Sequence, residues 1–406
     1  MAGDWPETTW GNIAELKYGK AMTAYTDQPN VARVYGTNGP IGWHDTALQP
    51  GPGVIVGRKG AYRGVHYADH PFWVIDTAYY LNPLVPMDLR WAYYWLLDYD
   101  VNNIDDGSPI PSTTREAFGF TPLKLPPLNE QERIADLLAS LDAKIDLNCQ
   151  MAATLEEMAR SLFKSWFVDF DPVHAKLEGR DIGLPAEIVA LFPGGFGDEG
   201  VPTGWNRKPI IDLAHWINGA AYKNMHFVSK DEGLPVIKIA ELKAGITSKT
   251  KFTGTDLGGR YKINDRELLF SWSGNPETSI DTFLWMNGEA WLNQHIFAVR
   301  ENGELSQPML HAMLKFLKPI FTSIARDKQT IGLGHVTKED MGRVFVALPK
   351  GDLLCALRDV FDALFEQYAE MISQNIALEA TKTTLLPRLV SGELRVKEAA
   401  ERVAAA

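Results

Sequence analysis

The stretch from residue 129 to residue 166 constrains the fold of this chain more than any other segment. Its apolar residues recur at alternating steps of four and three, which is the spacing of a heptad seam on a long helix. Because an exposed helix has no reason to keep such a seam, we expect the seam to pack against another element. The seam consists of Ile134, Leu138, Leu141, Ile145, Asn148, Ala152, Leu155, Ala159, Leu162 and Trp166, of which Asn148 alone carries a polar amide.

The chain contains a second copy of this helix. Residues 356–390 align with the first helical stretch at a constant offset that places Asn375 on Asn148. A Pro-bearing segment typical of a strand precedes each helix, at 121–128 and at 343–350. The globular parts correspond more faintly, and the matching segments are 54–60 with 268–274, 73–81 with 291–299, and 16–25 with 217–227. Two copies of one unit predict a molecule with an internal pseudo-twofold repeat.

Short β-branched or aromatic runs bounded by Gly, Pro and Asn predict strands and turns, with helices at 89–98 and 307–325 between them. The predicted fold class is α+β, with two mixed α/β domains separated by an antiparallel coiled coil of the two long helices. The predicted parts are a first domain (1–128), a first long helix with its exit segment (129–180), a Gly- and Pro-rich linker (181–204), a second domain (205–349), and a second long helix with a C-terminal tail (350–406).

Antiparallel packing about a pseudo-twofold axis would place Asn148 and Asn375 at the centre of the helix pair, where the two amides can meet. A buried Asn pair lowers stability but penalises slipped registers, so the pair is predicted to fix the register. Tolerance of each Asn at a loosely packed position is the alternative. Glu379 and Lys382, which lie on the second seam, favour looser packing there.

Composition excludes some classes of protein and leaves others open. The sequence has no apolar run of about 18 residues and no signal-peptide pattern, so a cytoplasmic protein is expected, and Cys149 and Cys355 are expected to stay reduced. The nine histidines show no zinc-ligand spacing, and no structural metal is predicted. The net charge of −11 argues against strong binding of phosphate by the chain alone, although residues 201–349 carry 18 basic and 15 acidic side chains.

Four stretches, in order along the duplicated chain, resemble the specificity subunit of type I restriction–modification enzymes. They are "VYGTNGPIGWHDTALQPGPGVIVGRKGAYRG" (34–64), "PPLNEQERIADLL" with "LDAKI" (126–145), "LFKSWFVDFDPVHAKLEGRDIGLPAEI" (162–188) and "TLLPRLVSGELRV" (384–396). The resemblance implies two target-recognition domains, each of which binds one half of a split, asymmetric site on double-stranded DNA. It also implies that the helices dock two modification subunits, which are adenine methyltransferases, and that restriction subunits join them.

The same resemblance implies that this subunit does no chemistry, so no catalytic residue and no bound cofactor are expected. S-adenosylmethionine, ATP and Mg²⁺ would belong to the partner subunits. The residues agree, because "SGNPETS" (273–279) has Glu277 where an adenine methyltransferase motif needs a second proline. No G-x-x-x-x-G-K-[ST] phosphate loop occurs, and "FPGGFG" (192–197) fits a linker better than a nucleotide site.

Bases in DNA are recognised by Arg, Lys, Asn or Gln side chains on elements that enter the major groove. The candidates lie in the paired Gly-rich segments and in the loops before the last strand of each domain. They are Tyr18, Lys20, Asn38, Arg58, Lys59, Tyr62, Arg63 and Ser108 in the first domain, and Tyr222, Lys223, Lys238, Ser273, Asn275, Gln294, His295, Gln329, Thr330 and His335 in the second. For each residue singly, a solvated turn is the alternative interpretation.

Two other functions compete with DNA recognition. The chain could be a scaffold in which the coiled coil spaces two protein-binding domains, or an enzyme whose motifs are not recognised. DNA footprinting would distinguish recognition from scaffolding. A methylation assay, with and without a modification subunit, would distinguish recognition from enzymatic activity.

Overall fold

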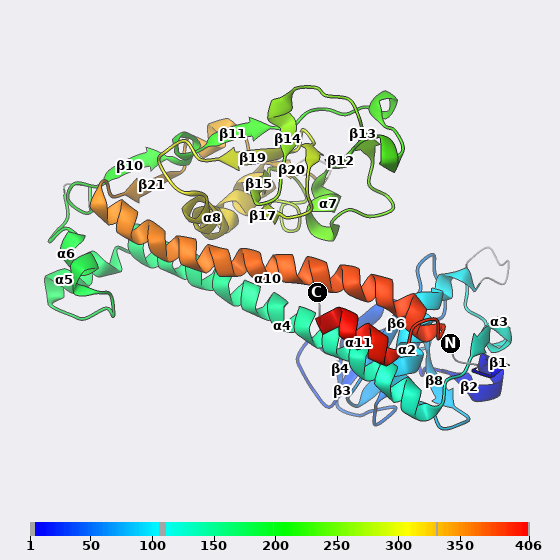
Figure 1. Ribbon diagram of the computed structural model, residues 1–406. Coiled ribbons are helices and arrows are strands. Elements are labelled where there is room, and N and C mark those ends of the chain that lie inside the picture. The colour runs from blue at the N-terminus through cyan, green and yellow to red at the C-terminus, as the bar shows by residue number, and fades with distance from the viewer. Residues whose placement is uncertain (1–4, 105–110, 198, 330–331, 405–406) are drawn as a thin grey trace. The chain divides into compact units, whose positions relative to one another are not determined.

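The computed structural model describes residues 5–104, 111–197, 199–329 and 332–404, and the chain forms two compact units (Figure 1). Unit 1 comprises Met1–Leu147 and Asn375–Ala406, and unit 2 comprises Asn148–Gln374. Each unit therefore contains one globular domain together with part of both long helices. In the described ranges, no helix is long and apolar enough to cross a membrane.

The two long helices are α4 (Leu128–Phe167) and α10 (Asp352–Val390), and each continues without a break from one unit into the other. Helix α4 begins directly after Pro126 and Pro127, and the carbonyl oxygen of Pro127 accepts hydrogen bonds from the N–H groups of Glu130 and Gln131. Helix α10 is followed by Gly392, whose positive φ of 77° is typical of a glycine that ends a helix.

The pairing of α4 with α10 is antiparallel in both units. In unit 1, Asn375 bonds the carbonyl oxygen of Ile145, and Lys382 bonds Asp142. In unit 2, Asn148 bonds Gln374, and the rings of Trp166 and Phe361 are 5.7 Å apart. Every predicted seam residue of α4 is buried or half-buried. The predicted antiparallel helix pair is confirmed.

Unit 1 has a four-stranded antiparallel sheet in the order β2-β8-β5-β6, built from β2 (Ala14–Tyr18), β8 (Ala78–Pro83), β5 (Gly53–Gly57) and β6 (Val65–Ala68). A smaller sheet has the order β4-β3-β7, with β3 parallel to β7, and consists of β4 (Gly39–His44), β3 (Ala32–Gly36) and β7 (Phe72–Val74). The first and last strands, β1 (Glu7–Thr9) and β9 (Pro122–Lys124), form an antiparallel pair.

Unit 2 repeats this topology with one added strand, β14 (Lys262–Ile263), in its second sheet. Its four-stranded antiparallel sheet has the order β11-β19-β15-β17, built from β11 (His215–Asn218), β19 (Ile296–Arg300), β15 (Glu267–Ser271) and β17 (Asp281–Trp285). The smaller sheet has the order β13-β12-β18-β14, with β12 parallel to β18, and consists of β13 (Phe252–Thr253), β12 (Leu234–Ile237), β18 (Ala290–Leu292) and β14 (Lys262–Ile263). Strands β10 (Asn206–Pro209) and β21 (Phe345–Leu348) pair as β1 and β9 do.

The helices of the two domains also correspond. Helix α2 (Leu89–Tyr99) follows the main sheet of unit 1 as α8 (Gln307–Asp327) follows that of unit 2, close to where the sequence predicts both. In unit 2, α8 lies between its sheet and α10 (Figure 1). Shorter helices are α1 (Trp10–Ile13), α3 (Arg115–Phe120), α7 (Ile239–Ala244), α9 (Lys338–Met341) and α11 (Val396–Ala404), and 3₁₀ turns lie at Val101–Asn103, Ile210–Leu213, Asn224–His226, Lys230–Glu232 and Gly259–Tyr261.

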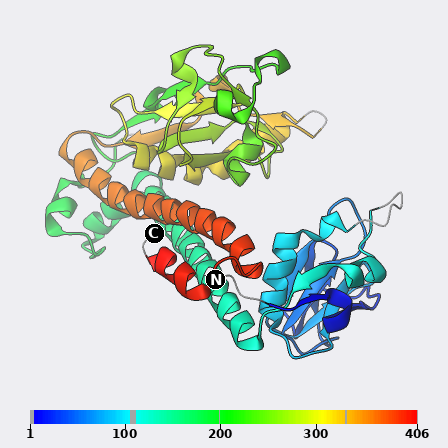
Figure 2. The ribbon, with the colours of Figure 1, turned by 45° about the vertical axis from the view of Figure 1, so that its right-hand side comes forward.

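Each unit has its own hydrophobic core, which joins the domain to the helix pair. In unit 1, Trp10, Trp91 and Leu96 pack with Leu138 of α4 and Leu389 of α10. Figure 2 shows the strands of this unit, coloured blue to cyan, with helices beside them. In unit 2, the core includes Phe163 of α4, Phe361 of α10 and Phe321 of α8. Both helices thus bury their apolar seams against a domain as well as against each other.

The Gly- and Pro-rich segment 181–204 does more than connect the domains. It follows α5 (Asp171–Glu178) and contains α6 (Ala186–Leu191). Phe192 is 2% exposed and packs near Trp205, with ring centroids 6.5 Å apart. Lys176 of α5 donates hydrogen bonds to the carbonyl oxygens of Val189 and Ala190, both at 3.1 Å. This segment is therefore anchored to the core of unit 2.

Candidate nucleic-acid interface

A glycine turn at the end of the first strand of each main sheet begins the candidate site. In unit 1, Gly19 N–H donates to Ala78 O at 3.1 Å, and Lys20 N–H donates to Val74 O at 2.8 Å. In unit 2, Gly219 N–H donates to Ile296 O at 3.1 Å, and Ala220 N–H donates to Leu292 O at 2.9 Å. The two turns are held by equivalent bonds.

Glycine is required in both turns because the backbone of the next loop approaches too closely for a side chain. A Cβ atom on Gly19 would lie 2.1 Å from the carbonyl oxygen of Ile75. On Gly219 it would lie 2.3 Å from the carbonyl oxygen of Asn293. The resemblance between 16–25 and 217–227 in the sequence reflects this shared contact.

Two further segments meet this turn in each domain. In unit 1, Arg58 N–H donates to Thr77 O at 3.1 Å, and Thr113 N–H donates to Arg58 O at 2.9 Å. The equivalent bonds in unit 2 run from Trp272 to His295 at 3.3 Å and from Val336 to Trp272 at 2.9 Å. Three segments far apart in the sequence therefore come together on one backbone frame in each domain.

We name the side chains on these frames the first-domain cluster and the second-domain cluster. The first-domain cluster is Tyr18, Lys20, Arg58, Lys59 and Arg115; the second-domain cluster is Asn218, Trp272, Ser273, Gln294, His295 and His335. Arg115, Asn218 and Trp272 are absent from the residues that the sequence predicts to contact DNA. The internal repeat could have predicted two of them, because the aligned segments place Asn218 at the position of Tyr18 and Trp272 at the position of Arg58.

The first-domain cluster is basic and is organised by one aromatic ring. The guanidinium carbon of Arg58 is 5.0 Å from the centroid of the Tyr18 ring, and that of Arg115 is 5.6 Å from it. Arg58 also donates to the carbonyl oxygen of Asp76 at 2.9 Å. The Tyr18 ring lies 5.0 Å from that of Tyr79, and burial raises the pKa of Tyr79 to about 12. Cation–π contact and a hydrogen bond thus preorganise Arg58 on a ring that is 49% exposed.

The second-domain cluster carries polar groups in place of the arginines. The indole N–H of Trp272 donates to Oδ1 of Asn218 at 2.9 Å, and its ring is 5.7 Å from that of His295. Nε2 of Gln294 lies 3.2 Å from Nε2 of His295. Short strands β16 (Ser273–Gly274) and β20 (Gly334–His335) pair Ser273 with His335. This cluster offers amide, imidazole and hydroxyl groups, which donate or accept hydrogen bonds.

Other predicted contact residues lie outside the two clusters. Asn38, Tyr62, Lys223, Lys238 and Gln329 are exposed. Lys238 Nζ stands 5.4 Å from the centre of the Phe227 ring. The Oδ1 atom of Asn275 accepts bonds from the backbone N–H groups of Glu277 and Thr278, so this side chain holds its own turn. Ser108 and Thr330 lie outside the described residues.

Two predicted DNA contacts need correction because their side chains are buried. Arg63 is 2% exposed, and its guanidinium donates at 2.9 Å to the carbonyl oxygens of Asn102 and Ile104. It holds the 3₁₀ turn after α2 instead of facing solvent. Tyr222 is 7% exposed and packs near Trp291, with centroids 6.2 Å apart, and burial raises the pKa of its hydroxyl to about 12. Sequence alone cannot distinguish an exposed turn residue from one that closes over the core.

In the described part of the chain, no group of three or more His, Cys, Asp or Glu side chains is arranged to hold a metal ion. His66 and His70, which are four positions apart, lie within and after β6, and burial lowers the pKa of His66.

Comparison with known proteins points to one family. Residues 3–157 match the family model described as the type I restriction modification DNA specificity domain. The chain is 25% identical over 331 residues to the type I restriction enzyme HindI specificity subunit of Haemophilus influenzae. The alignment covers 70% of this chain and 71% of that one. It is 24% identical over 305 residues to the MjaIX specificity subunit of Methanocaldococcus jannaschii, with coverage of 73% and 66%.

The fold also has a counterpart among solved structures. The type I restriction–modification S subunit from M. genitalium superposes with a TM-score of 0.55, at 17% identity, over 95% of this chain and 96% of that one. At this identity the likeness concerns the fold alone.

Two copies of one domain, each joined to the helix pair and each carrying a polar cluster on the same backbone frame, define a protein built from two equivalent domains. Residues 3–157 match the type I restriction modification DNA specificity domain, and the chain resembles specificity subunits of type I restriction enzymes over about 70% of its length.

Proposed function

We propose that each domain binds one half of a split, asymmetric DNA site, the first half through the first-domain cluster and the second half through the second-domain cluster. The observation that carries this proposal is that one hydrogen-bonded frame holds different side chains in the two domains. A shared frame supports the same approach to DNA by both domains. Different side chains support different sequences in the two half-sites.

The chemistry of the clusters supports a division of base preference. Arg58, Lys59 and Lys20 are donors, and Arg or Lys pairs best with O6 and N7 of guanine. Exposed Asn218 offers an amide that can donate and accept, as recognition of adenine requires. We therefore expect guanine in the half-site of the first domain and adenine among the bases contacted by the second.

The partners belong to the same proposal. Two modification subunits would dock on the helices α4 and α10, and restriction subunits would join them. S-adenosylmethionine, ATP and Mg²⁺ would be bound by those partners, and the complex would act on cytoplasmic DNA. With a net charge of −11, the lone chain would bind its site weakly, because phosphate contacts dominate affinity.

The test is methylation of random DNA by the complex with modification subunits. We expect two fixed half-sequences separated by unspecified bases. Replacing residues 1–125 with the equivalent part of another specificity subunit should change one half-sequence and leave the other intact. A swap that changes both halves would show that the domains do not act independently. Failure of the complex to select any sequence would favour the scaffold interpretation.

A further inference from the structure

In unit 1, a three-way polar contact joins the domain to both long helices. The hydroxyl of Tyr94, on α2, donates to Oδ2 of Asp142, on α4, at 2.6 Å. Lys382, on α10, forms an ion pair with the other oxygen of Asp142, and its Nζ lies 5.9 Å from the centre of the Tyr94 ring. We name Tyr94, Asp142 and Lys382 the first junction.

In the first junction, Tyr94 is buried and its two charged partners are half-buried. Tyr94 is 2% exposed, and burial together with its bond to Asp142 raises the pKa of its hydroxyl. The side chains of Lys382 and Asp142 are 19% and 31% exposed. A second contact ties the start of α2 to α4, because buried Gln131 accepts a bond from Asp88 N–H at 3.0 Å. Hydrogen bonds in such an environment are strong and costly to leave unmade.

Unit 2 contains an equivalent contact made from other residues. Lys315, on α8, places Nζ 3.0 Å from Oε2 of Glu156, on α4, and 3.2 Å from Oδ1 of Asp281, on β17. His311, also on α8, lies 3.7 Å from Glu156, and its ring is 5.1 Å from that of Tyr368, on α10. We name Glu156, Lys315, Asp281, His311 and Tyr368 the second junction. The Lys315 side chain is 13% exposed.

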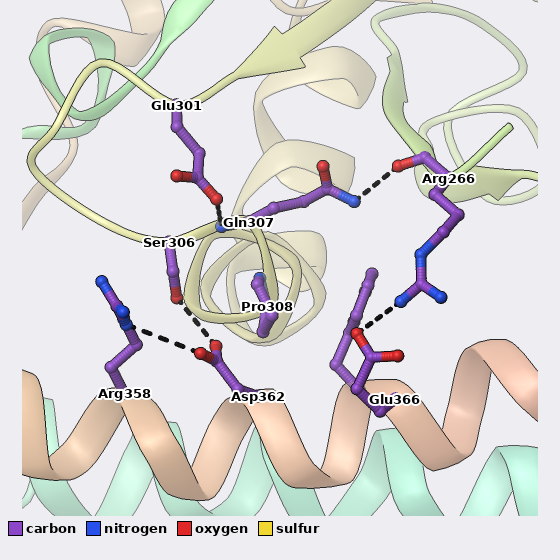
Figure 3. A pocket seen from close by; sticks show the side chains of 9 residues that line it. Arg266, Glu301, Ser306, Gln307, Pro308, Arg358, Asp362 and Glu366 are labelled. Carbon is purple, nitrogen blue, oxygen red and sulfur yellow. Dashed lines mark hydrogen bonds and ion pairs between the residues drawn. The ribbon is translucent and has the colours of Figure 1, made fainter. Parts of the chain in front are cut away.

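Residues that line a polar pocket beside the second junction form further contacts between the second domain and α10 (Figure 3). Arg266 forms an ion pair with Glu366 at 2.5 Å, and Ser306 donates to Asp362 at 3.3 Å. Gln307 donates to the carbonyl oxygen of Arg266 at 2.6 Å, which ties the start of α8 to the turn before β15. The second domain is thus held on α10 by named polar pairs as well as by its apolar core.

Apolar packing alone would define the position of a domain along a helix poorly. Dispersion and burial change little when an aliphatic side chain moves by a fraction of a turn, whereas a buried ion pair or hydrogen bond is lost. Each junction joins an acid of α4 to a group on the helix of the domain and to α10. A shift of the domain along either helix would therefore break at least one of these contacts.

We propose that the first and second junctions are positioning elements that fix each recognition domain at one place on the helix pair and so sharpen the selection of spacer length. The proposal rests on the proposed function, since spacer length has meaning only if the two domains bind two half-sites. The junction residues touch no base in this proposal. They act through the position of the domains.

The test uses conservative variants in the full complex with modification subunits. The half-sequences selected by the wild-type complex are placed in a DNA library in which only the spacer varies. Tyr94→Phe keeps the ring and removes the hydroxyl, and Glu156→Gln keeps the shape and removes the charge. We expect methylation at spacers one base pair shorter or longer to rise about fivefold relative to the preferred spacer, with both half-sequences unchanged.

Matched controls exist on the same helices. Tyr99→Phe alters a tyrosine of α2 whose ring stacks on Trp95 at 5.1 Å, within the domain. Glu157→Gln alters the exposed glutamate beside Glu156 on α4, which pairs with Arg160 of the same helix. Both controls should keep the wild-type spacer profile.

The outcomes separate the two proposals. If Tyr94→Phe and Glu156→Gln lower the melting temperature but keep the spacer profile, the junctions are merely structural and the inference is wrong. If the wild-type complex selects no pair of half-sites, the proposed function itself fails. Should Glu156→Gln not fold, Tyr94→Phe alone decides, because its packing is conserved.

Discussion

The side-chain amide of Asn148 donates a hydrogen bond of 3.2 Å to Oε1 of Gln374, the residue before Asn375. Asn375 donates in turn to the backbone carbonyl oxygen of Ile145 at 3.3 Å. Both bonds lead to partners other than the opposite asparagine, although the seam predicts a meeting of the two amides. The role of the pair in setting the register stays a prediction.

Replacement of Asn148 tests that role. The residue is fully buried, and its Oδ1 atom finds no hydrogen-bond partner among the described residues. Asn148→Leu should raise the free energy of unfolding by about 1 kcal/mol, since it removes an unpaired oxygen and adds apolar burial. It should also broaden spacer selection if the amide fixes the register. Gln150→Leu, at an exposed site of the same helix, is the control in thermal unfolding and spacer assays.

Replacement of Gly19 or Gly219 by alanine should weaken recognition of one DNA half-site and leave the other unchanged. Gly19→Ala and Gly219→Ala each force a Cβ atom to within 2.4 Å of carbonyl oxygens, so we expect a loss of about 1–3 kcal/mol in stability. Gly19→Ala should weaken recognition of the first half-site only, and Gly219→Ala that of the second. Gly195→Ala is the control, because its Cβ would meet no atom within 4 Å. Equal losses at both half-sites would contradict the assignment of the clusters.

Arg58 and Arg63, which are five positions apart, should behave differently on replacement. Arg58→Ala should lower affinity for the first half-site by about 1–3 kcal/mol and leave the melting temperature nearly unchanged. Arg63→Met should lower stability by roughly 1–3 kcal/mol, because the carbonyl oxygens of Asn102 and Ile104 lose their donor. Binding at fixed salt and thermal unfolding measure the two effects. A folded Arg58→Ala protein with wild-type affinity would exclude Arg58 from the DNA contact.

The helices should act as a ruler between the half-sites. Insertion of one heptad after Ile145 and one after Ile372 keeps both seams in phase. The pair would lengthen by roughly 10 Å, or about three base pairs of DNA. Activity should fall because the domains turn around the DNA, but any site still methylated should gain spacer and keep both half-sequences. Insertion in one helix alone should lower stability. A doubly lengthened, folded protein that selects the original spacer would disprove the ruler.

Stability in acid should depend on His311. Burial lowers the pKa of this histidine to about 3, from an ordinary value of 6.5, so the unfolded chain binds its proton first as the pH falls. His311 therefore contributes stability above pH 6.5, and that contribution is lost toward pH 3 at about 1.4 kcal/mol per pH unit. His311→Gln should flatten the decline of melting temperature between these limits, measured beside the wild type at matched ionic strength. An unchanged slope would show that His311 is solvated.

Much of the architecture can be predicted from the sequence because it depends on local periodicity. The alternating steps of four and three predict the long helix α4, and the repeat predicts its partner α10. The apolar runs at 54–60 and 268–274 correspond to β5 and β15, which occupy the same place in the two sheets. Gly19 and Gly219 are conspicuous in the sequence because each turn admits no side chain.

The composition of the site depends on contacts that only the folded chain makes. Arg58 and Arg63 stand in one turn and look alike in the sequence, but Arg63 meets carbonyl groups about 40 residues away and is buried. Arg115 joins the site because α3 returns to Tyr18, and Trp272 joins it through Asn218. Periodicity is a property of neighbouring residues, and it therefore survives in the sequence. The partner of a polar side chain is chosen by tertiary packing, and so is its exposure to solvent.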